Sequence, residues 1–200
     1  QLDKQNRKFT YTLLDKELKF NRYEESFLWL KDAAVAIPAY IVSEPKSPLM
    51  MSKETNVFKL YLSDVGLLTG SYPVSVRHDL LAMNPDQIIN NGALFENFVA
   101  QEFYTTQPSI YYYKKKNLGE VDFILETQGK IIPVEVKSGK NYKKHAALNR
   151  LLEAYSFETA CVLSLNNVEQ SDGIVYLPIY MAGLIPKETD SSYPDQIPAL

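Results

Sequence analysis

The sequence has 200 residues, of which 46% are hydrophobic and 22% charged, as is usual for a globular chain of one large or two small domains. A net charge of −3 excludes a chain that is basic throughout, so nucleic acid would have to bind a local basic patch. The single cysteine, Cys161, excludes an internal disulfide and, in an apolar run, predicts a buried thiol in a reducing, cytoplasmic setting. No apolar run approaches the length of a membrane span, so we expect no membrane contact.

The first part of the chain predicts a helix over 21–34, a strand over 35–42, a proline-containing turn and a strand over 58–62. This order resembles the end of a winged helix, a module that contacts DNA in some proteins and docks proteins in others. We therefore expect a partial winged-helix region at 1–70, followed by a connector at 71–90. The chain starts without methionine, which suggests a fragment cut from a longer polypeptide inside the winged helix.

The second part predicts an α/β domain over 91–186, followed by a polar tail at 187–200. Its expected elements are a helix over 93–104, a strand over 110–114, two strands over 120–125 and 133–137, a helix over 143–155, and a strand over 159–165. The predicted order is α-β-β-β-α-β.

The two middle strands can be aligned on paper, because Gln128-Gly129 between them suits a two-residue hairpin loop that pairs Thr127 with Lys130. The pairs that follow on one face are Leu125 with Ile132, Phe123 with Val134, and Val121 with Val136. That face is wholly apolar and is expected to pack on a core.

The other face of this predicted hairpin carries charges. Asp122 falls opposite Glu135, and Glu120 opposite Lys137, unless a bulge at Pro133 shifts the register. Opposed carboxylates repel each other, and a divalent cation between them would reverse that repulsion. The alternative interpretation is a surface ion pair of Glu120 with Lys137, worth about 0–1 kcal/mol, beside a solvated Asp122.

The element order and this constellation together resemble the PD-(D/E)xK restriction-endonuclease-like fold. The resemblance implies that Asp122 and Glu135 bind a divalent metal, Mg²⁺ or Mn²⁺, and that Lys137 positions the attacking water or stabilises developing charge. It also implies a further acid on the first helix, here Glu96. The family's usual proline before the aspartate is absent, because Val121 precedes Asp122.

A second resemblance covers nearly all of the chain. Four segments, 58–68, 92–99, 120–123 and 133–139, resemble in order those of DUF4143, a domain of unknown function. This family typically lies at the C-terminus of prokaryotic AAA-like (AAA_14) ATPases. The resemblance implies a partner ATPase domain in the same polypeptide, with ATP bound only there, because no Gly-x-x-x-x-Gly-Lys-Ser/Thr occurs in this sequence.

These features favour an accessory domain that hydrolyses DNA phosphodiesters with metal assistance. A non-catalytic module that binds protein or nucleic acid, or a purely oligomerising domain, remains open. Lys114, Lys115, Lys116 and Lys140 lie near the predicted site in sequence and suggest a groove for the DNA backbone, or alternatively a solvated loop.

Overall fold

The computed structural model describes residues 9–10, 29–81, 91–107 and 109–185. Residues 29–32 are helical. The elements that follow the chain are β1 (Phe9–Thr10), β2 (Ala36–Val42), η3 (Leu49–Ser52), β3 (Lys53–Leu62), α2 (Val65–Gly70), α3 (Val74–Leu81), α4 (Gly92–Tyr104), β4 (Ile110–Lys115), β5 (Gly119–Thr127), β6 (Lys130–Val136), α5 (Ala146–Ala154), β7 (Ala160–Ser164), β8 (Glu169–Ser171), β9 (Ile174–Pro178) and η4 (Ile179–Leu184).

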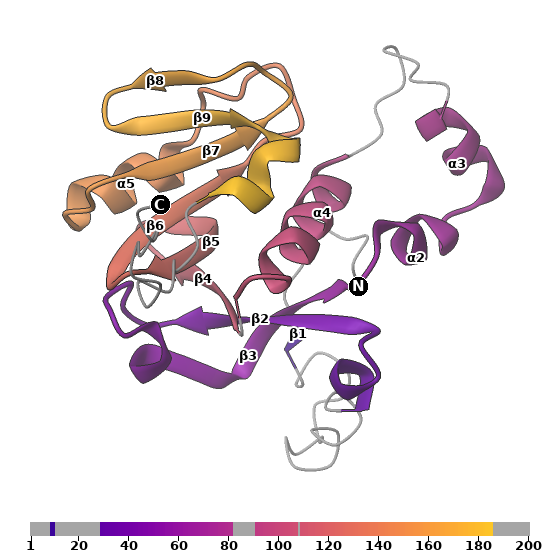
Figure 1. The fold of residues 1–200 in the computed structure, drawn as a ribbon, viewed down its shortest axis with the longest axis horizontal. Coiled ribbons are helices and arrows are strands. Elements are labelled where there is room, and N and C mark those ends of the chain that lie inside the picture. Colours follow the sequence, from indigo (N-terminus) through magenta and orange to yellow (C-terminus); the bar gives the residue numbers. More distant parts are fainter. Residues whose placement is uncertain (1–8, 11–28, 82–90, 108, 186–200) are drawn as a thin grey trace, which may run out of the picture.

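Within the described residues, nine strands form one mixed sheet in the order β1-β3-β2-β4-β5-β6-β7-β9-β8 (Figure 1). The contiguous strands β4, β5 and β6 pair antiparallel, whereas β2 with β4, β6 with β7, and β7 with β9 pair parallel. The sheet therefore runs across the boundary that we expected between a winged-helix remnant and a nuclease-like domain. The reason is that β2 uses its second edge to pair with β4, which satisfies main-chain groups that an isolated hairpin would leave open.

Helices cover both faces of this sheet. One apolar cluster joins Val99 and Phe103 of α4 and Ile179 of η4 to the sheet, and it contains Phe123 and Val134. A second cluster joins Leu148 and Leu151 of α5 to the opposite face. Figure 1 shows α4 and α5 on these two sides. Strand β7 is buried along its whole length, as expected for a parallel strand in the middle of a covered sheet.

The predicted order α-β-β-β-α-β is confirmed as α4-β4-β5-β6-α5-β7. The boundaries differ in places: β3 begins at Lys53, well before the expected start at 58, and α5 begins only at Ala146. The expected connector at 71–90 contains the helix α3. Most of the predicted 21–34 helix, the end of the connector and the tail at 187–200 lie outside the described residues. Across the part of the chain that the structure describes, every helix is too short or too polar to span a bilayer.

Candidate functional site

The hairpin of β5 and β6 supports the site, and its predicted register is confirmed. Thr127 pairs with Lys130, and Phe123 pairs with Val134. Positive φ angles at Gln128 (51°) and Gly129 (73°) let the two-residue turn match the twist of the strands. The pairing continues regularly through Pro133, so no bulge occurs there.

A bulge lies instead on the other side of β5, against β4. Tyr111 pairs with Ile124 and Tyr113 with Val121, so three steps on β5 match two steps on β4. In a regular strand, the side chains of Val121 and Phe123 would lie on the same face, and the bulge places them on opposite faces. Val121 packs in the cluster on the α5 face, whereas Phe123 packs on the α4 face. The prediction that both belong to one apolar face was therefore wrong, because a second neighbouring strand sets the course of β5.

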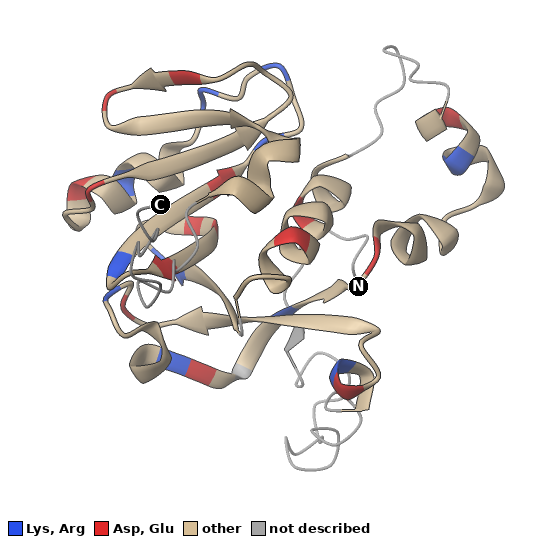
Figure 2. Cartoon of the chain, in the orientation of Figure 1, with Lys and Arg blue, Asp and Glu red and all other residues tan. Residues whose placement is uncertain are grey.

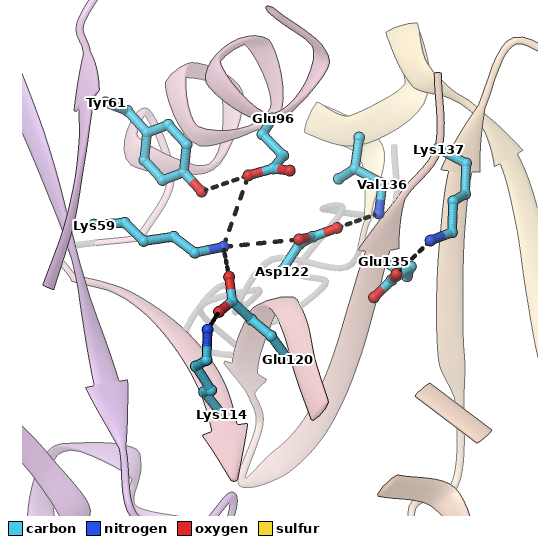
Figure 3. Close-up of polar contacts among 9 residues, drawn as sticks. All are labelled: Lys59, Tyr61, Glu96, Lys114, Glu120, Asp122, Glu135, Val136 and Lys137. Carbon is cyan, nitrogen blue, oxygen red and sulfur yellow. Dashed lines mark hydrogen bonds and ion pairs between the residues drawn. The ribbon is translucent and has the colours of Figure 1, made fainter. Parts of the chain in front are cut away.

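Asp122 lies where β5 and β6 separate. The pairs between these strands end at Phe123 and Val134, and the Oδ2 atom of Asp122 accepts a hydrogen bond of 2.9 Å from the main-chain nitrogen of Val136. The carboxylate thus accepts the hydrogen bond that this N–H would donate to a carbonyl oxygen in a regular sheet. It is thereby fixed beside the main chain that carries Glu135 (Figure 3).

Glu135 is buried, and only one of its two carboxylate oxygens has a hydrogen-bond partner among the described residues. Its Oε1 atom accepts a 2.6 Å hydrogen bond from Nζ of Lys137, and its Oε2 atom has no hydrogen-bond partner among the described residues. Burial and then the charge of Asp122 raise the pKa of Glu135 to about 7, and the opposing effect of Lys137 is too small to cancel them. The structure therefore brings together three of the four predicted site residues, Asp122, Glu135 and Lys137.

Glu120 does not pair with Lys137, so the predicted opposition of these two residues was wrong. Its Oε1 atom lies 2.9 Å from Nζ of Lys59, and its Oε2 atom lies 2.5 Å from Nζ of Lys114. Burial alone would raise the pKa of Glu120, but the two ammonium groups lower it to about 2. Glu120 is a cross-strand partner of Lys114 on β4, which explains the choice of partner.

Glu96 lies on α4, the helix that packs over this part of the sheet. The neighbouring Asn97 accepts a 2.8 Å hydrogen bond from the main-chain nitrogen of Leu62 and donates a 2.9 Å bond to its carbonyl, which ties α4 to the end of β3. Glu96 consequently faces β3. Its Oε2 atom accepts a hydrogen bond of 3.3 Å from the Tyr61 hydroxyl and lies 3.7 Å from Nζ of Lys59.

Lys59 is the residue that the sequence analysis missed. It is 1% exposed, and its Nζ atom also lies 3.7 Å from Oδ1 of Asp122. Burial acts to lower the pKa of Lys59, but the oxygen-bearing groups of Tyr61, Asp122 and Glu120 raise it above its ordinary range, so the ammonium stays charged. The only sequence signal is a lysine inside an apolar strand, which does not tell a buried lysine from an exposed one.

The fold resemblance implies a divalent metal ion, and the side chains of the site fit such an ion only in part. Among the described residues, no group of three or more His, Cys, Asp or Glu side chains is placed to hold a metal ion. The pair of Asp122 and Glu135 still fits one, because Mg²⁺ often takes only one or two carboxylates and completes its shell with water and phosphate. The unpartnered Oε2 atom of Glu135 is a free ligand atom at this point. Glu96 does not join the pair, because Lys59 and Tyr61 hold its carboxylate.

One protein-family model matches the part of the chain that carries the site. Residues 91–182 match the family model of the domain of unknown function DUF4143. This DUF4143 region runs from α4 into η4, and it includes Glu96, Asp122, Glu135 and Lys137 but not Lys59. No curated protein and no solved structure matched the chain. The expected resemblance is thus supported over 91–182, and the AAA-like ATPase context and the nuclease-like fold stay predictions.

The basic side chains of the DUF4143 region do not form one uniform patch. Figure 2 shows basic and acidic positions interspersed along the strands and helices. Lys114 forms an ion pair with Glu120, whereas Lys115, Lys116 and Lys140 are exposed. Lys115 pairs with Gly119 at the end of the β4–β5 ladder, so Lys115 and Lys116 lie at the turn that leads into Glu120 and Asp122.

Proposed function

We propose that the DUF4143 region is a nuclease-like module that hydrolyses phosphodiester bonds in DNA with the help of one divalent metal ion, Mg²⁺ or Mn²⁺. The observation that carries this proposal is the unpartnered, buried Oε2 atom of Glu135 beside Asp122 and Lys137. A buried carboxylate oxygen without a partner is costly, and a bound cation would remove that cost.

The residues take distinct roles in this proposal. Asp122 and Glu135 would hold the metal, which when bound lowers the pKa of a water molecule and polarises the phosphate. The side chain of Lys137 is 27% exposed, so its ammonium group can reach a phosphate that approaches from solvent. There it would stabilise the negative charge that develops on the phosphate. Lys115, Lys116 and Lys140 would contact the DNA backbone without reading its sequence.

Glu96 has a different role from the one that the fold resemblance implied. Its carboxylate is engaged by the buried Lys59 and by the Tyr61 hydroxyl, so we assign it to the support of the site rather than to the metal. This assignment leaves a site of two carboxylates and one lysine.

The second candidate function is a non-catalytic module that binds DNA or a protein, such as an AAA-like ATPase domain of the same polypeptide or a second copy of the chain. The observation that favours it is the contact of Lys59 with Asp122, because an ammonium that neutralises this carboxylate weakens its attraction for a metal.

Metal binding and cleavage separate the two candidates. We expect Mn²⁺ to raise the melting temperature of the wild-type chain and to support cleavage of linear DNA, with EDTA abolishing both effects. Glu135→Gln should lose both, and Lys137→Met should lose cleavage. Glu158→Gln is a matched control, because Glu158 is an exposed acid paired with Lys130 on the surface.

Three outcomes decide the matter. A metal-dependent rise in melting temperature without cleavage refutes hydrolysis and leaves Asp122 and Glu135 as a metal-binding pair. Cleavage that survives Glu135→Gln refutes the site. A wild-type chain that neither cleaves DNA nor responds to Mn²⁺ refutes the enzyme and supports the non-catalytic module.

A further inference from the structure

Three parallel strands, β6, β7 and β9, end at the same edge of the sheet. Val136 on β6 pairs with Leu163 on β7, and Leu163 pairs with Leu177 on β9. The main-chain nitrogen of Lys137 donates a further 2.8 Å hydrogen bond to the carbonyl of Leu163. Neighbouring strands lie about 5 Å apart, so the chain leaves β9 about 10 Å from Lys137. The segments that directly follow these strands form what we call the strand-end surface: 137–144, 165–168 and 179–184.

The strand-end surface carries positive charge and no acid. Its first segment contains four lysines, and none of its three segments contains an aspartate or a glutamate. Two of the lysines are paired with acids outside the surface, Lys137 with Glu135 and Lys143 with Glu169. The other two are exposed. A surface of this charge suits an anionic partner.

The lysine-bearing segment is anchored to the sheet. Glu169 on β8 accepts a 2.6 Å hydrogen bond from Nζ of Lys143 and a 3.3 Å hydrogen bond from the Tyr142 hydroxyl. His145 directly follows the segment and is buried, and its Nε2 atom lies 2.9 Å from the Tyr176 hydroxyl on β9. The segment is therefore fixed at both ends, which lowers the cost of ordering it when a partner binds.

Large apolar side chains are exposed on the other two segments. Tyr180 is 74% exposed, and Leu165 is 69% exposed. Tyr180 belongs to η4, which Figure 1 shows at the end of β9 and beside α4. Because Ile179 and Ala182 of η4 are buried in the core, the main chain that carries the Tyr180 ring is fixed. A tyrosine held in this way offers a large contact area at a low cost in entropy.

Lysines beside an exposed aromatic ring match the chemistry of a nucleic-acid strand whose bases are unpaired. In a duplex the faces of the bases are hidden in the stack, whereas an unpaired base can stack on an aromatic side chain. We propose that the strand-end surface binds an unpaired segment of DNA, with a base stacked on Tyr180 and phosphates along the lysine-bearing segment. This inference rests on the proposed function for the choice of DNA as partner, and it adds the form of DNA that the site takes.

The test measures binding by fluorescence anisotropy with the full chain in EDTA, so that no metal-dependent reaction occurs. The labelled probes are a single strand of DNA, the same strand in a blunt duplex, and a peptide of alternating glutamate and leucine. Tyr180→Ala removes the ring, and Tyr180→Phe keeps it. Trp29→Ala is the matched control, because Trp29 is 75% exposed but precedes β2, which β4, β5 and β6 separate from β7 in the sheet.

We expect the wild type to bind the single strand more tightly than the blunt duplex. Tyr180→Ala should weaken binding of the single strand by about tenfold or more, the usual effect of losing one stacked base, and leave duplex binding unchanged. Tyr180→Phe and Trp29→Ala should bind as the wild type does. Lys140→Gln should weaken binding of both DNA forms and reduce its dependence on salt, because a phosphate contact is lost.

Equal binding of the two DNA forms by the wild type would overturn the inference. So would a Tyr180→Ala chain that binds the single strand as the wild type does, or a Trp29→Ala chain that loses as much affinity. A chain that binds the peptide and neither form of DNA would make the strand-end surface a protein-docking site and refute the inference.

Cleavage is measured separately with Mn²⁺, so the inference and the proposed function can fail independently. A chain that binds single-stranded DNA through Tyr180 and does not cleave it supports the inference and refutes hydrolysis. Cleavage of both DNA forms that Tyr180→Ala leaves unchanged supports hydrolysis and refutes the inference.

Discussion

Replacement of Glu135 by glutamine would probe the electrostatics of the site through the pH dependence of stability. In the folded chain, burial and the neighbouring charge of Asp122 raise the pKa of Glu135 from its ordinary value of 4.5 to about 7. In the unfolded chain the side chain is solvated and recovers its ordinary value. The folded state therefore keeps a proton that the unfolded state has already released.

The sign of the effect follows from this difference. A raised carboxyl pKa adds stability that is fully present below the unfolded pKa and is lost as the pH rises through the folded pKa. The loss falls between pH 4.5 and about 7. Each pH unit in that window is worth about 1.4 kcal/mol, so the total is on the order of 3 kcal/mol. Glu120 does not interfere, because its pKa of about 2 places its own contribution at much lower pH.

The assay is urea unfolding at pH 5 and pH 8, in EDTA to exclude metals, for the wild type, Glu135→Gln and the control Glu158→Gln. We expect the wild type and the control to lose free energy of unfolding between the two pH values. Glu135→Gln should lose about 2.5 kcal/mol less, since glutamine does not titrate and part of the effect already falls below pH 5. All other titrating groups are common to the three chains, so their effects cancel in the comparison. If Glu135→Gln has the same pH dependence as the wild type, Glu135 is not buried next to a charged Asp122 and the reasoning fails.

Two further substitutions test the framework of the site by chemical denaturation. Asn97→Ala removes both hydrogen bonds to the main chain of Leu62 and should cost about 2–3 kcal/mol of unfolding free energy, because two strand groups lose their partner; a loss below about 0.5 kcal/mol would mean that α4 is not anchored there. Gly119→Ala should cost more than about 1 kcal/mol, because Gly119 has a φ of 96° and an added Cβ would lie 2.9 Å from Cβ of Ala147 on α5; a neutral result would show that α5 packs more loosely on this turn.

The hairpin of β5 and β6 shows how much of the site could be predicted locally. The Gln128-Gly129 turn and the alternation of side chains set the pairing from Thr127 to Phe123, because both strands and their turn are contiguous in the chain. The same reasoning found Asp122, Glu135 and Lys137 as neighbours. The predicted neighbours of Val121 and Glu120 were wrong, because β4 imposes a bulge on the other edge of β5.

Glu120 and Glu96 mark the limit of such reasoning. The register predicted from the sequence placed Lys137 opposite Glu120. In the structure, the carboxylate of Glu120 contacts Lys114 on β4 and Lys59 on β3 instead. Glu96 was expected at the metal because helix acids complete the site in the PD-(D/E)xK family, and it contacts Lys59 and Tyr61 instead.

The sequence by itself determined the order α4-β4-β5-β6-α5-β7, the hairpin register from Thr127 to Phe123 and the acid–lysine group at its end, because each depends on residues close together in the chain. Only the tertiary structure decided that the early strands β2 and β3 join the same sheet and lay Lys59 against β5. A lysine and a carboxylate far apart in sequence attract each other through space, and no local pattern records which distant strand will bring them together. The charge of the candidate site is therefore set by a residue that lies outside the DUF4143 region.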